Sequence, residues 1–208
     1  WNDNFRADIL PEIKRIESPE TAQGNYVFDP SNGYISIEAE HYNTLKDADN
    51  AKWTVIPYMG RTLSGISVMP YNQPVAGASI SYKMKLPTDI KTVTVHVVVK
   101  STLAFKNLDG HRYKVGFNEQ EMKTINFNSD LNEKPENIYS VFYPTVARRI
   151  VEKMVKLNVP ATADGVRVLT LTPLDPGIVF EKIVVDFGGY KNSYLFMNES
   201  PSKRDVTK

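Results

Sequence analysis

Short runs of alternating apolar and polar residues recur along most of this chain, and they constrain its fold more than any other feature. A two-residue period predicts β-strands with one buried face. Turn residues separate the runs, and many short strands at this spacing indicate a β-sandwich or jelly roll rather than an α/β fold. The expected strands are residues 34–40, 53–57, 64–69, 78–85, 91–99, 112–118, 122–127, 165–172 and 178–187.

Two connecting stretches carry local signals of their own. Asp109-Gly110 lies between the runs 91–99 and 112–117, and an Asp-Gly pair in that position predicts a β-hairpin. Residues 144–159 fit both a helical and an extended pattern. We expect a short helix that begins at Pro144 and ends near Glu152, followed by a strand that ends near Val159.

The sequence predicts one antiparallel β-sandwich with a short helix and an N-terminal extension. Residues 1–24 are punctuated by proline and glycine and are expected to be a connector from an upstream domain. Without a signal peptide, the start at Trp1 is typical of a mature form or an excised piece. We expect the sandwich to span residues 25–198, with part of the chain after Gly189 packing back, and the charged residues 199–208 to form a flexible tail.

Composition excludes several classes of function. A formal net charge of +1 gives no sign of a nucleic-acid or anionic-membrane partner, and no apolar run reaches the ~18 residues of a membrane-spanning helix. The absence of cysteine excludes disulfides, thiolate metal sites and a cysteine nucleophile. A sandwich of this length can be stable without disulfides, so a secreted protein is still allowed.

Several ordered motifs resemble the C-terminal domain of glycoside hydrolase family 115. The resemblance covers roughly residues 33–200 and rests on long stretches that occur in the same order. These are residues 33–41, Trp53 with Ile56-Pro57, residues 60–65, Ser101-Thr102-Leu103 with Phe105, Asp109-Gly110 with Arg112-Tyr113, Asp175-Pro176-Gly177 through Gly188-Gly189, Ser193-Tyr194-Leu195 and Glu199-Ser200.

The resemblance implies that the parent protein is a large, multidomain, inverting α-glucuronidase. Members of this family remove 4-O-methyl-glucuronic acid or glucuronic acid from xylan side chains, and an upstream barrel with its neighbouring domains holds the catalytic centre. The C-terminal domain of the family is an accessory β-sandwich that is similar in shape to carbohydrate-binding modules. The enzymatic activity is therefore expected of the parent protein and not of these 208 residues.

Glu38 and Glu40 form the sharpest group of chemically competent residues. An i, i+2 pair on a strand places both carboxylates on one face about 6.5–7 Å apart, near the ~6.5–9.5 Å of an inverting glycosidase pair. A catalytic pair flanks a bond from two sides, however, whereas these neighbours lie side by side. A structural Ca²⁺ site fits better, because Ca²⁺ prefers hard oxygen ligands.

The resemblance supports this reading, because related sugar-binding sandwiches place calcium at the opening strand with help from the closing strand. Glu181 or Asp186 is the expected third ligand, and we take Glu38, Glu40 and Asp186 as the candidate set. The alternative is an exposed polar face with ordinary ion pairs to Lys182 or Arg61.

Trp53, Tyr58 and Arg61 form a candidate carbohydrate site. Sugar rings stack on aromatic faces, and an arginine can bind a uronate carboxylate through two hydrogen bonds. For Trp53 a place in the core is favoured, since large aromatic side chains are usually well buried. The three histidines show no ligand spacing, and for His96, within an apolar strand, a structural role is favoured.

We therefore expect a non-catalytic accessory β-sandwich of a secreted α-glucuronidase, periplasmic or extracellular in a bacterium, with no required cofactor. It would brace the catalytic domains of the same polypeptide or the contacts of a homodimer, through aromatic segments such as Tyr139, Phe142 and Tyr143. A glucuronoxylan polysaccharide is a further candidate partner. The alternative is an independent carbohydrate-binding module, and a weaker one is a sandwich that only binds other proteins.

Overall fold

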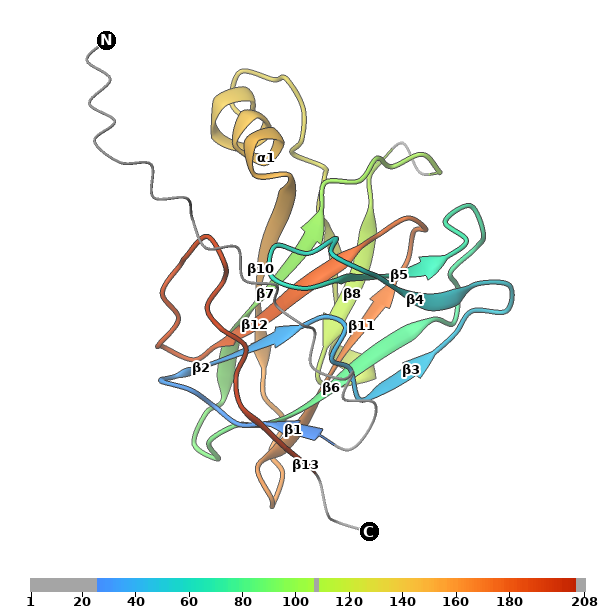
Figure 1. Ribbon diagram of the computed structural model, residues 1–208. Coiled ribbons are helices and arrows are strands. Elements are labelled where there is room, and N and C mark those ends of the chain that lie inside the picture. Colours follow the sequence, from blue (N-terminus) through green and yellow to red (C-terminus); the bar gives the residue numbers. More distant parts are fainter. Residues whose placement is uncertain (1–25, 107–108, 205–208) are drawn as a thin grey trace, which may run out of the picture.

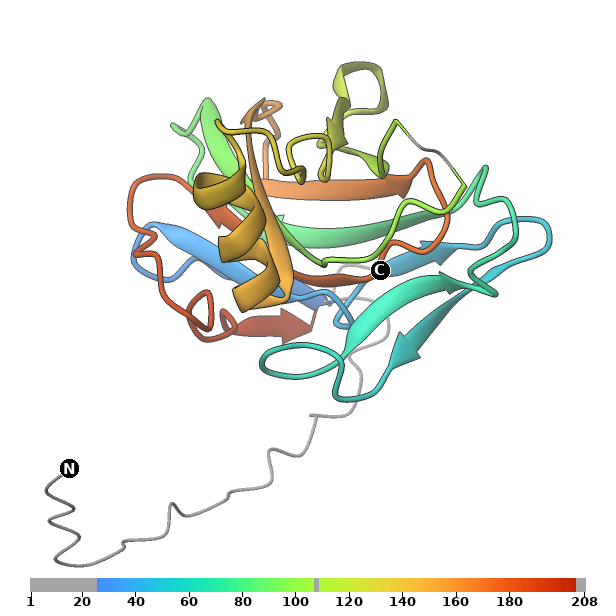
Figure 2. The same cartoon turned by 90° about the horizontal axis from the view of Figure 1, so that it is seen from above.

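Two β-sheets face each other in the structure, a computed structural model that describes residues 26–106 and 109–204 (Figures 1 and 2). The expected β-sandwich is therefore confirmed. The connector expected at residues 1–24 lies outside the described residues. No helix in the described part is long and apolar enough to cross a membrane.

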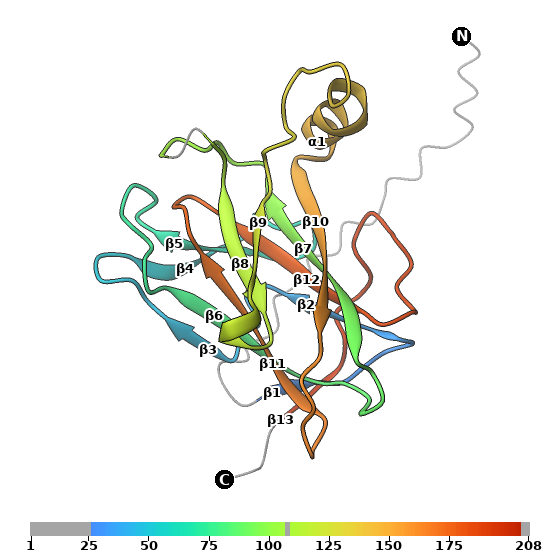
Figure 3. The ribbon, with the colours of Figure 1, turned by 180° about the vertical axis from the view of Figure 1, so that it is seen from behind.

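The first sheet has the strand order β13-β1-β6-β11-β8-β9, with β3 also paired to β6 (Figure 3). All its pairs are antiparallel except the short contact between β1 and β6. Its strands are β1 (Tyr26–Phe28), β3 (Thr44–Lys46), β6 (Ser79–Lys85), β8 (Arg112–Gly116), β9 (Lys123–Asn126), β11 (Val166–Pro173) and β13 (Ser202–Arg204).

The second sheet has the strand order β10-β7-β12-β5-β4, with β2 also paired to β12. Its strands are β2 (Tyr34–Glu38), β4 (Lys52–Ile56), β5 (Gly65–Met69), β7 (Thr92–Lys100), β10 (Ile150–Asn158) and β12 (Phe180–Asp186). β2 pairs with β12 from Lys182 onward, whereas β5 pairs with it at Phe180. The end of β2 and the start of β5 therefore meet at one place along β12.

The core lies between the two sheets and follows from the alternating pattern. In β6 the apolar side chains of Ile80, Tyr82 and Met84 are buried, while the residues between them are partly exposed. They pack against inward-facing side chains of the second sheet, among them Val97 and Ile183. Each of the nine expected strands is present, with ends shifted by up to two residues.

Two glycines, Gly33 and Gly189, allow the segment before β2 and the segment after β12 to pack closely. Gly33 has φ +85°, and a Cβ at Gly189 would lie 1.6 Å from the carbonyl oxygen of Asn32. Only glycine fits such a close approach of two backbones. The turn before β2 and the turn after β12 are therefore packed together, which explains why a Gly-Gly pair ends the last long strand.

The hairpin predicted from Asp109-Gly110 is wrong. β7 pairs with β10 and β12 in the second sheet, whereas β8 pairs with β9 and β11 in the first. The chain between β7 and β8 therefore passes from one sheet to the other. The Asp-Gly pair indicates a local turn, but it does not determine which strands pair. Strand pairing depends on which sheet faces are buried against each other.

The predicted helix is present but begins earlier and ends earlier. A π-helical turn, η2 (Ile138–Phe142), leads into α1 (Tyr143–Arg148), and Pro144 lies in the first turn of α1 as predicted. Arg149 ends the helix in a left-handed conformation with φ 57°. The strand β10 then begins at Ile150, three residues before the predicted boundary at Glu152–Lys153.

The prediction of a flexible tail at residues 199–208 is wrong for the part that the structure describes. Residues 202–204 form β13 along β1, and Ser200 is buried. We expected these residues to be exposed because many of them are charged. The chain instead crosses the second sheet before it reaches β1. The sandwich therefore extends beyond residue 198, to Arg204.

Candidate functional site: a charged cluster beneath the C-terminal strap

Residues 190–200, here called the strap, lie against part of the second sheet, beside β2 and β12 (Figure 1). Phe196 of the strap packs with Tyr34, Val98 and Val184, which point away from the central core. This second, smaller apolar cluster confirms that the chain after Gly189 packs back in part. Tyr194, in contrast, is 71% exposed.

A β-bulge in β12 places two charged side chains under the strap. Phe180 pairs with Val99 and Lys182 pairs with Val98, so Glu181 is an extra residue in β12. Lys182 lies directly opposite Glu38 of β2, and side chains of opposite residues share one face of a sheet. The Lys182 ammonium lies 2.8 Å from Glu38 Oε1, and both side chains are almost completely buried.

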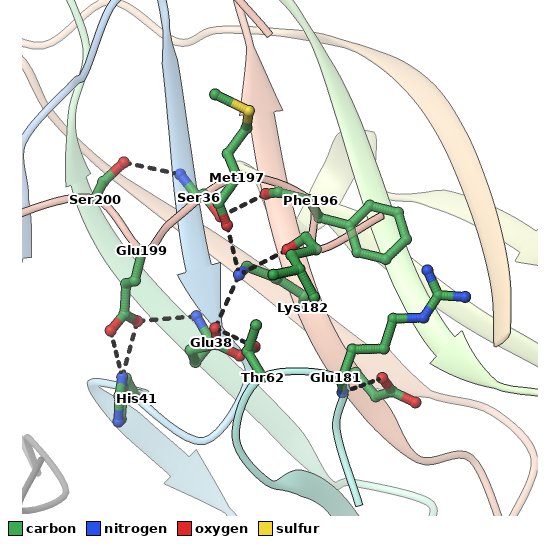
Figure 4. A network of polar contacts seen from close by, with 12 residues as sticks. Ser36, Glu38, His41, Thr62, Glu181, Lys182, Phe196, Met197, Glu199 and Ser200 are labelled. Carbon is green, nitrogen blue, oxygen red and sulfur yellow. Dashed lines mark hydrogen bonds and ion pairs between the residues drawn. The ribbon is translucent and has the colours of Figure 1, made fainter. Parts of the chain in front are cut away.

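The strap supplies the other acceptors that the buried ammonium needs. Lys182 Nζ donates to the carbonyl oxygens of Leu195 at 3.2 Å and Met197 at 2.8 Å (Figure 4). The Ser36 hydroxyl donates to the carbonyl oxygen of Phe196. Phe196 and Met197 have φ of 56° and 65°, a conformation that costs side-chain-bearing residues about 1–2 kcal/mol each. These inward-facing carbonyl groups offset that strain.

The end of the strap is bound to β2 and the turn that follows it. Glu199 accepts a hydrogen bond from the main-chain N–H of Glu38, and both of its carboxylate oxygens lie 2.8 Å from His41 Nδ1. The Ser36 main-chain N–H donates to the Ser200 hydroxyl. In Figure 4, Glu199 and Ser200 lie along one edge of β2, and Lys182 lies on the other side of this strand.

The loop between β4 and β5 closes the cluster from the other side. Thr62 donates to Glu38 Oε1 at 2.6 Å, and the Ser64 main-chain N–H donates to Glu40. The Arg61 main-chain N–H donates to Glu181 Oε2. Glu181 therefore holds the loop to β12, in addition to the contacts of the loop with Glu38 and Glu40.

We call these seven side chains the charge cluster: Glu38, Glu40, His41, Lys100, Glu181, Lys182 and Glu199. The Lys100 ammonium lies 2.9 Å from Glu181 Oε1, as an ion pair rather than a directed hydrogen bond. Every carboxylate of the cluster thus has a partner from this chain. Buried charges are tolerated only when they are paired in this way.

Two members of the cluster have shifted pKa values. Burial lowers the pKa of His41, but the hydrogen bond and negative charge of Glu199, with further help from Glu40 and Glu38, outweigh it and raise the pKa overall. Burial raises the pKa of Glu181, and the opposing effect of Lys100 is smaller. Outside the cluster, burial lowers the pKa of His111.

The structure does not bring together the three residues predicted to bind calcium. Glu38 and Glu40 share one face as predicted, but Lys182 is the partner of Glu38. Asp186 lies opposite Tyr34 and accepts hydrogen bonds from the main-chain N–H groups of the turn after β12. Among the described residues, no three carboxylate or imidazole groups are arranged to hold a metal ion. These residues therefore do not fit one calcium site.

Of the alternatives weighed for the two glutamates, the ion pair between Glu38 and Lys182 is present, but the face that carries it is buried and not exposed. Arg61 instead donates to the carbonyl oxygens of Tyr194 and Arg148.

The three residues predicted to bind carbohydrate also lie in different environments. Trp53 is buried, donates to the carbonyl oxygen of Lys46 and packs on Phe180, so its predicted place in the core is confirmed. Tyr58 is 74% exposed. Arg61 reaches the strap, where its guanidinium lies 4.0 Å from the centre of the Tyr194 ring.

His41 and Glu199 are members of the cluster that the sequence did not single out. Glu199 stands in the charged stretch that was expected to be flexible, and His41 lacks ligand spacing. The apolar residues just before Glu199, including Phe196, were the available signal that the chain stays on the sheet as far as Ser200. His96 is the structural histidine that was expected, since its ring lies between Glu152 and Tyr190.

Solved structures with a similar fold include a glucuronidase and several carbohydrate-binding modules. One is BtGH115A, described as a family GH115 4-O-methyl-α-glucuronidase with specificity for decorated arabinogalactans, with a TM-score of 0.51 and 14% identity. The match covers 71% of this chain and only 18% of that chain.

Two further matches are carbohydrate-binding modules. The C-terminal family 6 module of the laminarinase LamC from Zobellia galactanivorans has a TM-score of 0.46 and 15% identity, over 74% of this chain and 98% of that chain. A family 35 module from Clostridium thermocellum has a TM-score of 0.42 and 13% identity, over 73% of this chain and 96% of that chain. The curated proteins contain no match to this chain.

A family model identifies the chain more directly. The model of the glycosyl hydrolase family 115 C-terminal domain matches residues 27–199, which confirms the resemblance expected over residues 33–200. Since the match covers most of the chain, this protein belongs to the glycosyl hydrolase family 115 C-terminal domain family.

Proposed function

We propose that this domain is the non-catalytic accessory β-sandwich of a secreted α-glucuronidase that acts on glucuronoxylan-type plant polysaccharide. The observation that carries the proposal is the closed charge cluster. Glycoside hydrolysis commonly uses two carboxyl groups that flank the substrate bond. The carboxylates of the cluster are instead bound by this chain's own lysines, histidine and main-chain N–H groups beneath the strap.

The role that we assign to the domain is to brace catalytic domains of the same polypeptide, or subunit contacts. The similar GH115 structure is a much longer chain, of which this one spans 18%. The surface best suited to such a contact is the aromatic projection formed by η2 and α1, in which α1 packs on β10 (Figures 1 and 2). Tyr139, Tyr143 and Val146 are 78%, 52% and 57% exposed there, and exposed aromatic groups often mark interfaces.

A pair of substitutions in the longer polypeptide tests this role. Tyr139→Ser with Tyr143→Ser removes two rings that pack together with centroids 5.7 Å apart. If they contact another domain, the melting temperature of the whole enzyme should fall and uronic acid release should decrease. The melting temperature of the isolated 208-residue chain should change little, because both rings are exposed there.

The matched control is Tyr71→Ser with Phe105→Ser. These two rings form a similar exposed pair, with centroids 5.6 Å apart, on different loops. We expect the control to leave the stability and activity of the longer enzyme close to wild type. Equal effects of the two double substitutions, or no effect of either, would refute bracing by the projection.

The alternative function is an independent carbohydrate-binding module, and one observation favours it. A cavity of about 330 Å³ lies between Arg61, Arg148 and Tyr194, open to solvent. Titrating the chain with glucuronoxylan oligosaccharides, with and without a chelator, separates the two functions. Binding tighter than about 1 mM favours the module, and a loss of binding with chelator would add calcium to it.

A further inference from the structure

The charged residues that line the cavity beside Arg61 are all positively charged. It forms where the loop between β4 and β5, the end of α1 and the strap meet. Its volume of about 330 Å³ is within the usual range of small-ligand sites. The residues that line it are Arg61, Arg148, Asn192, Ser193, Tyr194 and Phe196. Two arginines, an asparagine, a serine and two aromatic residues therefore line the cavity, without an acidic residue.

Arg61 is held in a fixed orientation before any ligand arrives. One terminal nitrogen donates to the carbonyl oxygen of Tyr194 at 2.7 Å, and the other donates to the carbonyl oxygen of Arg148 at 2.8 Å. The guanidinium lies 4.0 Å from the centre of the Tyr194 ring. Each terminal nitrogen carries two N–H groups, so each retains one further donor.

The positive charge at this place is not compensated by an ion pair. Arg148 is exposed at the end of α1, and within the described part of the chain its guanidinium forms no hydrogen bond or ion pair. Glu181 binds the main-chain N–H of Arg61 and is paired with Lys100. An anion that entered the cavity would therefore meet the oriented guanidinium of Arg61 and the positive charge of Arg148 beside it.

We propose that this cavity binds the carboxylate of a sugar, that is, a uronate residue, against the exposed ring of Tyr194. Arginine binds carboxylates through paired, charge-assisted hydrogen bonds, and an aromatic ring offers the apolar face on which a sugar ring packs. Asn192 and Ser193 supply neutral hydrogen-bonding groups for sugar hydroxyls. The choice of a uronate among organic carboxylates rests on the proposed function.

An NMR titration of the 208-residue chain tests the site with three probes. D-glucuronate carries both the carboxylate and the ring, glucose carries only the ring, and acetate carries only the carboxylate. We expect glucuronate to shift the amide signals of Arg61 and of residues 192–196, and the shifts to weaken as salt is added. Glucose that binds as well as glucuronate, or shifts confined to other surfaces, would overturn the proposal.

Exposed residues of the cavity allow variants that keep the fold. Arg148→Gln and Tyr194→Ala should each weaken glucuronate binding by about five- to tenfold, because each removes one ligand contact at a partly screened site. Arg149→Gln is the matched control: it removes the same charge from the next residue, which is exposed but does not line the cavity. Equal losses from Arg148→Gln and Arg149→Gln would show a non-specific charge effect and refute the site.

Polymer-derived probes identify the source of the uronate and separate this site from the proposed function. Oligosaccharides from glucuronoxylan and from uronate-decorated arabinogalactan are compared with the same backbones after removal of the uronate. Binding that disappears with the uronate supports the site, and binding that persists overturns it. If uronate binding fails while Tyr139→Ser with Tyr143→Ser still weakens the longer enzyme, the cavity is refuted and the accessory role is kept. If uronate binds but the double substitution leaves the longer enzyme unchanged, only the bracing role is refuted.

Discussion

Lys182 and Glu38 have side chains that are only 3% and 4% exposed, so their charges are removed from water. The cost of burying two ions is offset only if each keeps its hydrogen bonds. Here the ammonium has three oxygen acceptors, and Glu38 Oε1 also accepts from Thr62. The pair is therefore expected to tolerate replacement of both residues much better than replacement of one.

The change Lys182→Met tests this directly. It leaves the Glu38 carboxylate buried without a counter-ion and should lower the free energy of unfolding by about 3–5 kcal/mol. Lys182→Met combined with Glu38→Gln should recover most of the loss. Urea-induced unfolding of the isolated chain measures both values.

The control for that experiment is Lys203→Met. Lys203 forms an ion pair with Asp29 on the surface, where its side chain is 82% exposed, and such pairs contribute about 0–1 kcal/mol. A loss at Lys203 as large as that at Lys182, or a double variant less stable than Lys182→Met, would contradict the assigned role of the buried pair.

At the scale of elements, the strap and β13 form a continuous closing segment. Glu199 and Ser200 bind β2, and residues 202–204 then pair with β1. A chain that ends at Asn198 should therefore be less stable than one that ends at Arg204 by at least about 2 kcal/mol, since several buried hydrogen bonds are lost. Equal melting temperatures for the two chains would show that the segment does not close the sheet.

The contact between the strap and β2 should depend on pH through His41. Its pKa is raised in the folded protein, because Glu199 and the nearby carboxylates outweigh burial. The stabilisation is then fully present below the unfolded pKa of ~6.5 and is lost as pH rises through the folded value. The stability difference between wild type and His41→Gln should therefore be largest near pH 6 and shrink toward pH 9.

His111 provides a test of opposite sign in the same unfolding experiment. Burial lowers its pKa and outweighs the hydrogen bond to the Pro176 carbonyl oxygen. Its stabilisation is present above the unfolded pKa and is lost as pH falls through the folded value. The difference between wild type and His111→Gln should therefore shrink in acid. A His41→Gln difference that also shrinks in acid would contradict the assigned contact with Glu199.

The alternating pattern predicts strands in this chain well, because it records which side chains are buried. β6 is the clear example, since its buried and partly exposed residues alternate. The pattern does not record which strands meet, and so the Asp109-Gly110 hairpin was wrong. The very short strands β1, β3 and β13 were missed, because three residues are too few to show a period.

The site was predictable to a similar extent. Glu38 and Glu40 share one face because of their spacing, and this was visible in the sequence. The bulge at Glu181 was not visible, although it brings that carboxylate to the same face as Lys182. Contacts of Glu38 with Lys182 and of His41 with Glu199 join segments more than 140 residues apart in sequence, which no local pattern reveals.

At the scale of the whole molecule, the domain is a sandwich whose charge cluster is closed by its own chain. Its outward-facing features include the aromatic projection at Tyr139 and Tyr143 and the cavity beside Arg61. This arrangement fits the two roles proposed for the domain, which are contact with neighbouring domains and binding of a uronate.

The most direct test of the non-catalytic role is an assay of the isolated 208-residue chain for uronic acid release. The substrates are glucuronoxylan and uronate-decorated arabinogalactan, with Glu38→Gln and Glu181→Gln as parallel samples. We predict no release above the buffer blank from any of the three proteins. Release by the unmodified chain that disappears in either variant would place catalytic carboxylates in the charge cluster and contradict the account.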